Sequence, residues 1–592
     1  MVAVSVPFLP SRRIDLNSIA VAGLLGALAL QWVLPFLWTA HWYPLPAFSS
    51  ELAAACCLAF GLLSCALLKR ADARIHWPLP ALLAGLAAVA VLQQAVGLLA
   101  YSQLAVRLVL FVAAMLAAYV LGRQIVALGR AREALCVLSA ACLLGAIFSV
   151  LVQCLQLFDL EILPFWLAAV YKNEVVQNRP FGNLAQANHQ ATYLALAALS
   201  AVYLGPIIRR AWLAPVSLLI LAFGIALTGS RMGAAFLVLL MLAQFVPTTL
   251  RPAQVRSRWL ACAAVLAGFA GGIAAVELVI GQIDTLGRPM GIRYELWWQA
   301  WQISLQQPLL GFGSGQFGGG QYLVARAGRY TLSANNAHNL ILDVAAEFGW
   351  PAAVATGSIG LYWGLKNLRE RLANSGQALV WGMLLLIGIH SMLEFPLWFL
   401  FFSIPASLLF ALGEPEDTRS ALVDARRILP AAGLTTIAIA VLLSVAYREV
   451  AEAATPQWLE YMHIRKRTPL DALPVLAVAD VKLFKPEVDR LLIDLRHPPD
   501  EGTDGPLERS ARLLHILPAP EIMAQHIIYL ARANRIDEAM VHVARLRIFA
   551  GAGYPALRDS VLDETRNLGP QTAPLRHALR QPLHSSNSGA AG

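Results

Sequence analysis

Long apolar segments separated by short polar gaps occupy the first three quarters of the chain. Thirteen of these segments predict membrane-spanning helices, because a helix needs about twenty mainly apolar residues to cross a bilayer. Their approximate ranges are 16–38, 51–68, 79–101, 104–121, 134–155, 189–208, 212–229, 232–250, 258–281, 338–365, 377–394, 396–412 and 429–447. We therefore predict an all-α, polytopic membrane domain over residues 1–447.

Every second gap between these segments is basic. The basic gaps contain Lys69, Arg70 and Arg74; Arg123, Arg130 and Arg132; Arg209 and Arg210; Arg251, Arg256 and Arg258; Lys366, Arg369 and Arg371; and Arg419, Arg426 and Arg427. An excess of Lys and Arg is typical of cytoplasmic loops. The pattern predicts a bacterial inner-membrane protein with a cytoplasmic N-terminus. The odd number of spans then places two long loops, 156–188 and 282–337, and the whole region after residue 447 in the periplasm.

The region after residue 447 has a different, more polar pattern. Apolar residues recur with helical spacing over 522–533 and 536–549, and the polar pair Asn534 and Arg535 separates the two stretches. This predicts a helix pair of tetratricopeptide type within a periplasmic helical domain, 448–569. From Pro570 onward the chain is rich in Pro, Ser, Gly and Ala, so we predict a disordered tail over 570–592.

Composition confirms the membrane class and narrows the partners. The chain is 58% hydrophobic and 14% charged, far from the soluble norm of about 25% charged residues. Its net charge of +9 comes from residues spread over the gaps, which argues against a nucleic-acid surface and leaves membrane lipid as the general partner. Acidic pairs are few: Asp159 and Glu161 form the one such pair on the predicted periplasmic side, and Glu414 and Glu416 lie on the predicted cytoplasmic side. A hard divalent cation needs several convergent oxygens, which a single pair does not supply. We expect no metal and no cofactor.

Three basic residues stand out on the predicted periplasmic side. Arg231 lies between two apolar segments with almost no loop, Arg293 begins an amphipathic helix in the second long loop, and His338 stands at the entry to the tenth span. Each has an ordinary explanation. Arg231 would reach the lipid headgroups from the interface, Arg293 would form a helix-surface ion pair with Glu295, and His338 would be an amphipathic interfacial side chain. Their position on one side of the membrane favours a shared site instead.

Together, these side chains fit one kind of chemistry. Two guanidinium groups can hold a pyrophosphate through charge-assisted, bidentate hydrogen bonds. A neutral imidazole can take a proton from a hydroxyl nucleophile near neutral pH. The set suits the attack of an alcohol on a sugar whose leaving group is a lipid pyrophosphate.

Several motifs carry a family resemblance. His338, Asn339 and Gly349 match the spacing of a signature of the O-antigen ligase superfamily, while Ala352 departs from its last small position. The segment 228–231 and the run from Arg293 to the turn 308–313 resemble the core of the same superfamily. The segments 41–51, 179–189 and 390–398 resemble motifs of its PglL-type protein O-oligosaccharyltransferases. In the last of these motifs the family commonly has a Tyr, implicated in transfer, where this chain has Phe395.

The resemblance implies an inverting, metal-independent glycosyltransferase. Such an enzyme moves a preassembled oligosaccharide from undecaprenyl pyrophosphate to Ser or Thr of a periplasmic or pilin protein. On this basis His338 is the general base, and Arg231 and Arg293 bind pyrophosphate. The resemblance also implies substrate-binding roles for four polar residues, for which helix and loop capping is the alternative: Arg179, Gln186, Asn188 and Asn339.

Other functions remain open from the sequence alone. An O-antigen ligase acting on lipid A core, or an O-antigen polymerase, would use the same donor with another acceptor. A transporter of lipid-linked glycan would be a different class. It is disfavoured because the unusual Arg and His residues gather on one face of the membrane instead of at mid-depth.

Overall fold

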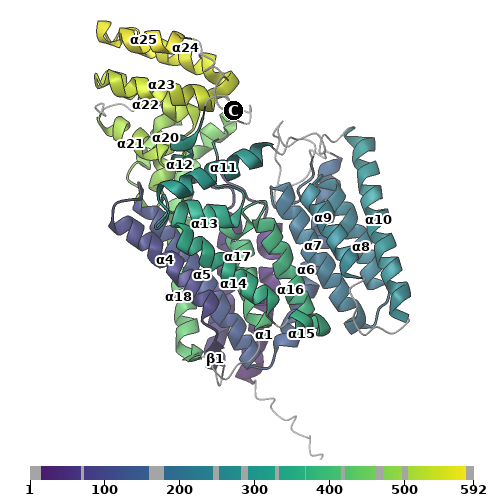
Figure 1. Cartoon of the computed structure of the whole chain (residues 1–592). Helices are drawn as coiled ribbons and strands as arrows, with labels where there is room; N and C mark the ends of the chain where they lie inside the picture. Colours follow the sequence, from purple (N-terminus) through teal and green to yellow (C-terminus); the bar gives the residue numbers. More distant parts are fainter. Residues whose placement is uncertain are drawn as a thin grey trace, which may run out of the picture.

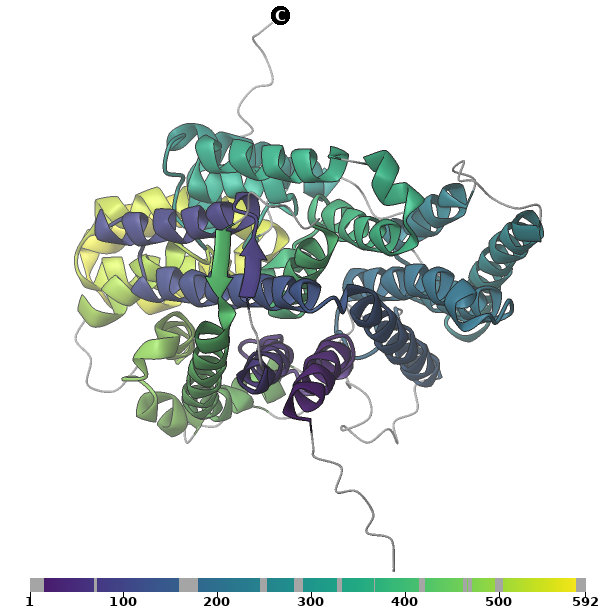
Figure 2. The ribbon, with the colours of Figure 1, turned by 90° about the horizontal axis from the view of Figure 1, so that it is seen from below.

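The computed structural model describes residues 15–68, 72–158, 179–244, 253–281, 291–326, 333–366, 368–414, 421–461, 466, 471–495 and 504–581. Asp159, Glu161 and the tail beyond 581 lie outside this range. Figures 1 and 2 show a helical membrane region, with a second group of helices at one end that is formed by the C-terminal part of the chain.

The helices of the membrane region and of its loops are α1 (Leu16–Gln31), α2 (Leu34–Leu37), α3 (Phe48–Ser64), α4 (Pro78–Ala95), α5 (Ser102–Ala127), α6 (Ala131–Leu157), α7 (Ala187–Ile208), α8 (Leu213–Leu227), α9 (Arg231–Ala243), α10 (Ala253–Val279), α11 (Gly291–Gln306), α12 (Phe317–Val324), α13 (Leu340–Phe348), α14 (Trp350–Leu365), α15 (Leu368–Ala373), α16 (Ser375–Ser391) and α17 (Leu400–Gly413). The rest of the described chain forms α18 (Ala425–Tyr461), α19 (Ala472–Ala477), α20 (Lys485–Asp494), α21 (Asp504–Leu514), α22 (Pro520–Arg532), α23 (Ile536–Ala550), α24 (Tyr554–Thr565) and α25 (Ala573–Arg580).

The chain is a membrane-embedded helical protein, as predicted. Among the described residues, eight helices are long and apolar enough to cross a membrane, and α8, α9, α16 and α17 are shorter apolar helices. The number of thirteen spans is not confirmed, because the expected span 338–365 is two helices. The chain breaks between α13 and α14 at Gly349, whose φ of +86° lies in the left-handed region.

A turn from the second long loop explains this break. The N–H of Phe312 donates to the carbonyl of Ala346 (2.8 Å), and the N–H of Trp350 donates to the carbonyl of Pro308 (2.8 Å). A Cβ on Gly349 would collide with the backbone carbonyl of Leu309, so only glycine permits this approach. The glycine of the superfamily signature therefore serves backbone packing.

Gln93 of α4 holds the same turn from the other side. Its fully buried amide donates to the carbonyls of Leu310 (2.6 Å) and Glu347 (2.7 Å) and accepts the N–H of Ser314 (3.0 Å). One side chain thus satisfies three buried backbone groups that helix and turn leave open. It fixes the second long loop to the membrane helices.

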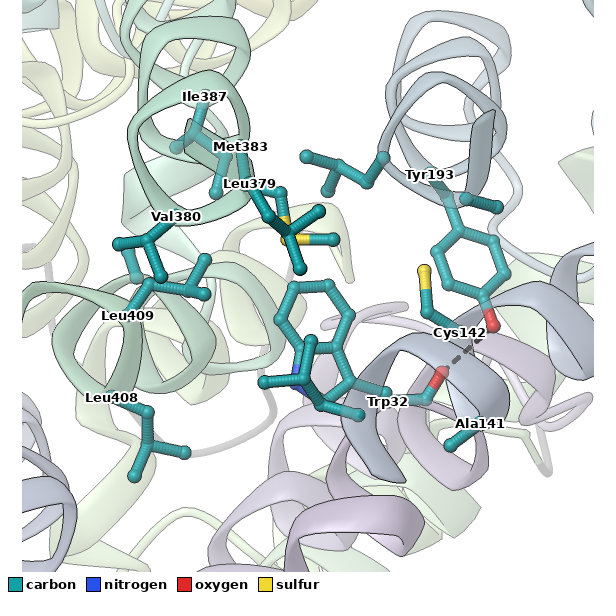
Figure 3. Packing of buried hydrophobic residues seen from close by; sticks show 14 of the residues in the cluster. Trp32, Ala141, Cys142, Tyr193, Leu379, Val380, Met383, Ile387, Leu408 and Leu409 are labelled. Atoms are coloured by element: carbon teal, nitrogen blue, oxygen red, sulfur yellow. Dashed lines mark hydrogen bonds between the residues drawn. The ribbon is translucent and has the colours of Figure 1, made fainter. Parts of the chain in front are cut away.

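Aromatic and aliphatic side chains from helices distant in sequence form the main core (Figure 3). The Tyr193 hydroxyl of α7 donates to the Trp32 carbonyl at the end of α1 (2.7 Å), and the Tyr193 ring stacks on Phe36 at 4.3 Å. Figure 3 shows Leu379 and Met383 of α16 directed toward Trp32. This packing joins α7, which begins at the candidate site, to α16, which ends there.

The all-α prediction misses one small element. Strands β1 (Asp72–Ile75) and β2 (Ala421–Asp424) pair antiparallel, and Figure 2 shows them side by side. The Arg123 guanidinium of α5 is 1% exposed and donates to three carbonyls nearby, those of Arg74, Ala411 and Glu414. Hydropathy does not predict such a ribbon, because each strand has only 4 residues and the two strands lie near opposite ends of the membrane domain's sequence.

The helix pair expected after residue 520 is confirmed as α22 and α23, with Asn534 at φ +58° in the turn between them. A repeat of tetratricopeptide type stays a prediction. The expected domain boundary at 447 lies inside the continuous helix α18. The expected disorder from Pro570 is wrong for its first part, because α25 inserts the fully buried Leu575 and Leu579 into the C-terminal core.

A buried carboxylate fixes the C-terminal region to the membrane helices. Asp489 of α20 is fully buried and accepts a hydrogen bond from the Tyr101 hydroxyl at the start of α5 (2.9 Å). Lys485 (2.6 Å), Arg509 (3.4 Å) and Arg512 (3.4 Å) surround the same carboxylate. Arg509 is buried beside it, with 7% of its side chain exposed, whereas Lys485 and Arg512 are 30% and 33% exposed. The burial of Arg509 is favourable only while that anion is present.

We expect Asp489→Ala to destabilise the protein by about 3–5 kcal/mol, because it leaves the buried Arg509 and the partly buried Lys485 and Arg512 without their anion. Thermal unfolding of the purified protein measures the effect. The matched control is Glu508→Ala, whose carboxylate pairs with Arg512 but is 71% exposed, so its loss should cost less than about 1 kcal/mol. Equal effects of the two substitutions would contradict the anchoring role.

Candidate active site

One carboxylate joins two of the three predicted site residues. Glu394, in the turn after α16, accepts a hydrogen bond from Arg293 of α11 on Oε1 (2.6 Å) and faces His338 Nδ1 with Oε2 (2.7 Å). The Glu394 side chain is only 6% exposed, whereas those of Arg293 and His338 are 30% and 27% exposed. The imidazole and the guanidinium are thus held side by side at an accessible surface.

This contact sets the charge of Glu394 and the proton on His338. Burial opposes ionisation of Glu394, but the hydrogen bonds and charges of His338 and Arg293 outweigh it, so the pKa of Glu394 is lowered. An ionised carboxylate only accepts hydrogen bonds, and therefore Nδ1 of His338 carries a proton. In the neutral imidazole the lone pair is then on Nε2, the nitrogen that can act as a base.

The backbone around His338 is held in an uncommon conformation. His338 has φ +54°, which is sterically unfavourable for a residue with a Cβ. Its N–H donates to the Asn336 side chain (3.2 Å), and the neighbouring N–H of Ala337 donates to the Asp343 carboxylate. Asn339 caps α13 by accepting the N–H of Leu342 (3.1 Å). Local hydrogen bonds thus hold the backbone at His338 in this strained conformation.

Asn188 connects Glu394 to the segment that carries Arg231. Its Nδ2 donates to Glu394 Oε1 (2.8 Å), and its Oδ1 accepts the hydroxyl of Ser230 (2.8 Å). Ser230 is also the N-cap of α9, where it accepts the N–H of Gly233 (3.1 Å), and Arg231 is the first residue of that helix. Two hydrogen bonds therefore connect Ser230, the residue before the exposed Arg231, through Asn188 to the carboxylate that His338 and Arg293 share.

The other polar residues of the first long loop have structural partners. Arg179 donates to the carbonyl of Thr228 (2.7 Å), which ties the loop to the start of the Arg231 segment. Gln186 caps α7 by accepting the N–H of His189 (2.5 Å). Capping thus explains the positions of Gln186 and Asn339, and substrate contact by Arg179, Gln186, Asn188 and Asn339 stays a prediction.

Phe395 keeps the aromatic contact with the imidazole. Its ring meets the His338 ring edge to face, with centroids 5.1 Å apart. A tyrosine at this position could make the same ring contact, so what this chain lacks relative to the family is only the hydroxyl.

Sequence reasoning did not identify Glu394 as a site residue. It is a buried acid at the end of a predicted span, and a charge at such a position requires a partner. The need for a partner is the signal in the sequence that could have identified Glu394 as a site residue. Behind it, and equally unforeseen, lie the buried His390 and His189, of which His390 meets the Thr192 hydroxyl at 2.8 Å.

We expect Glu394→Gln to destabilise the protein by about 1–3 kcal/mol at pH 7, because a neutral amide replaces the anion that Arg293 and His338 share. Since the pKa of Glu394 is lowered in the folded protein, its contribution is present above the unfolded-state value of about 4.3 and is lost as the pH falls through the folded value. The difference in Tm between the variant and the unchanged protein should therefore shrink below about pH 4. Glu452→Gln, at an exposed carboxylate, is the control and should show no such difference.

Three segments of the chain that contain these residues match families of known proteins. Residues 216–357, which contain Arg231, Arg293 and His338, match the O-antigen ligase family. Residues 180–204 match the protein glycosylation ligase family, and residues 378–560, which contain Glu394, match the C-terminal part of a virulence factor membrane-bound polymerase family.

A general O-oligosaccharyltransferase of Acinetobacter baylyi is 24% identical over 333 residues. The match covers 52% of this chain and 56% of the relative, so it spans about half the length of each protein. The resemblance noted from the motifs is thus confirmed independently in the first long loop, around the three basic residues and in the region that follows. The chain is therefore similar to the O-antigen ligase superfamily and, within it, to proteins of the PglL type.

Proposed function

We propose that this protein is a glycosyltransferase that moves a preassembled oligosaccharide from undecaprenyl pyrophosphate to a Ser or Thr hydroxyl of a protein. The observation that carries the proposal is the shared carboxylate of Glu394, which holds a base and a pyrophosphate ligand, His338 and Arg293, next to each other. The site faces the periplasm in the proposed orientation, with the N-terminus in the cytoplasm.

In the proposed reaction the acceptor hydroxyl oxygen attacks the anomeric carbon of the glycan. A bond forms between that carbon and the hydroxyl oxygen, and the bond to the pyrophosphate oxygen breaks with inversion. The hydroxyl proton passes to Nε2 of His338, and the anionic Glu394 stabilises the resulting imidazolium. Arg231 and Arg293 stabilise the negative charge that develops on the departing pyrophosphate.

A protein acceptor is favoured over lipid A core or a growing glycan by two observations. The segment at the first long loop matches the protein glycosylation ligase family, and the relative in A. baylyi is an O-oligosaccharyltransferase. The polar C-terminal helices pack against α12, and we propose that an acceptor protein, pilin-like or otherwise periplasmic, is received there. Ligation of the glycan to lipid A core and polymerisation of the glycan on its carrier remain the alternatives, because the chain also matches an O-antigen ligase family and a polymerase family.

Transfer with purified full-length protein tests the proposal. The assay contains an undecaprenyl-pyrophosphate-linked glycan and a pilin, with and without a chelator, and parallel reactions offer lipid A core in place of pilin. We expect an increase in the mass of the pilin, unchanged by the chelator. Product on lipid A core alone, or polymer on the lipid carrier alone, would overturn the choice of acceptor.

We expect His338→Ala to lower kcat by about a hundredfold to ten-thousandfold, the range for loss of a general base, while the protein still binds the lipid-linked donor. Donor binding is measured separately by retention of the labelled lipid. His577→Ala removes an exposed histidine of α25 and should leave kcat unchanged. Full transfer by the His338 variant would exclude it as the base.

We expect Arg231→Gln to lower kcat/KM for the donor by about tenfold to a hundredfold, because one charge-assisted contact to pyrophosphate is lost. The pH dependence of kcat should keep its shape, since the base is intact. The matched control is Arg210→Gln, an exposed arginine in the gap between α7 and α8. An equal loss in both variants would exclude a specific role of Arg231.

A further inference from the structure

A second charged hollow lies at the opposite end of the membrane region. In Figure 1, α15 and β1 are at the lower end, whereas α22 to α25 are at the upper end. The hollow has a volume of about 30 Å³ and lies between the start of α4 and the ends of α14 and α17. Its polar lining consists of His76, Tyr362, Trp363, Lys366, Arg371 and Glu414.

Arg371 is the unusual member of this lining. It is 5% exposed, and its guanidinium lies 4.0 Å from the centre of the Trp363 ring. Within the described part of the chain, its buried Nη1 has no hydrogen-bond partner. Such a group costs free energy unless something else fills its hydrogen-bonding capacity.

Among the residues that the structure describes, the charges around the hollow leave an excess of positive charge. Arg123 and Arg371 are both buried, and the buried carboxyl described near them belongs to Glu414, which also accepts the Tyr119 hydroxyl. The guanidinium of Arg123 donates to three backbone carbonyls. Because carbonyls carry no net charge, they do not neutralise it. Lys366 adds a further cation, 5.3 Å from the Tyr362 ring. An anion at the hollow would be stabilised in this low-dielectric setting.

The surroundings identify the source of that anion. Large apolar side chains beside the hollow are exposed, among them Leu361 (64%), Leu365 (60%) and Tyr362 (55%) of α14 and Trp77 (58%) before α4. Exposed aliphatic residues next to Trp and Tyr are typical of a surface that meets lipid at the membrane interface. A ligand at this place comes from the bilayer.

We propose that this hollow binds the phosphate of an anionic membrane phospholipid, with Arg371 and Lys366 as its cationic ligands. A volume near 30 Å³ accommodates about one water-sized group, hence one phosphate oxygen, against Arg371. The remainder of the headgroup stays at the mouth beside Lys366, and the acyl chains follow the apolar face of α14. The site is separate from the transfer chemistry, because it lies at the other end of α14 from Gly349.

Lipid titration of the full-length protein in detergent tests this proposal. The probes are dioleoylphosphatidylglycerol, dioleoylphosphatidylcholine and inorganic phosphate, and the readouts are native mass spectrometry of bound lipid and the shift in Tm. We expect phosphatidylglycerol to bind and to raise Tm more than the other two. Arg371→Gln should weaken its binding about tenfold or more, as expected for the loss of one charge-assisted hydrogen bond.

Two further variants keep the test decisive. Arg369→Gln removes the same charge from an exposed position on the same helix, α15, and should leave lipid binding unchanged. Lys366→Gln, at the mouth, should weaken binding by about threefold without disturbing buried packing. The proposal is overturned by equal binding to the unchanged protein, Arg371→Gln and Lys366→Gln, by equal binding of the two lipids, or by equal stabilisation with inorganic phosphate. If Arg371→Gln does not fold, an unchanged affinity in Lys366→Gln overturns it.

Discussion

The arrangement of the candidate site depends on one carboxylate. Glu394 uses one oxygen for Arg293 and the other for His338, and Asn188 shares the first of these. Because the carboxylate is buried, its charge is little screened, and it orients both partners strongly. A histidine and an arginine would otherwise repel each other when the imidazole is protonated. The anion between them removes that conflict and leaves the outer faces of both side chains accessible.

Rigid backbone contacts hold the partners of this carboxylate in place. The break at Gly349 lets the turn 308–313 pack against the junction of α13 and α14, and Gln93 fastens the same turn to α4. Since Arg293 precedes this turn and His338 precedes α13, the two side chains approach Glu394 from segments whose ends are fixed. Preorganisation of this kind is what a transfer site needs if charge is to be stabilised without rearrangement during the reaction.

Buried charges recur elsewhere in the described part of the molecule, and they differ in how far they are compensated. Asp489 gathers three cations and Tyr101 where the C-terminal region meets α5. Arg123 is satisfied by carbonyls near the β-ribbon, and Arg371 keeps an open hydrogen-bonding position. Because an unpaired charge is costly in a membrane protein, these three sites mark a domain junction, a structural brace and a candidate lipid site.

The sequence by itself determined the features that depend on neighbouring residues. Apolar runs predicted the membrane helices, helical spacing predicted α22 and α23, and the unusual Arg231, Arg293 and His338 drew attention to the candidate site. Tertiary structure alone decided which acid they meet, because Glu394 is 56 residues from His338 and 101 from Arg293 along the chain. The break at Gly349, the β-ribbon and the packing of α25 were also decided there. Each arises from contacts between segments distant in sequence, and no local pattern of hydropathy records such contacts.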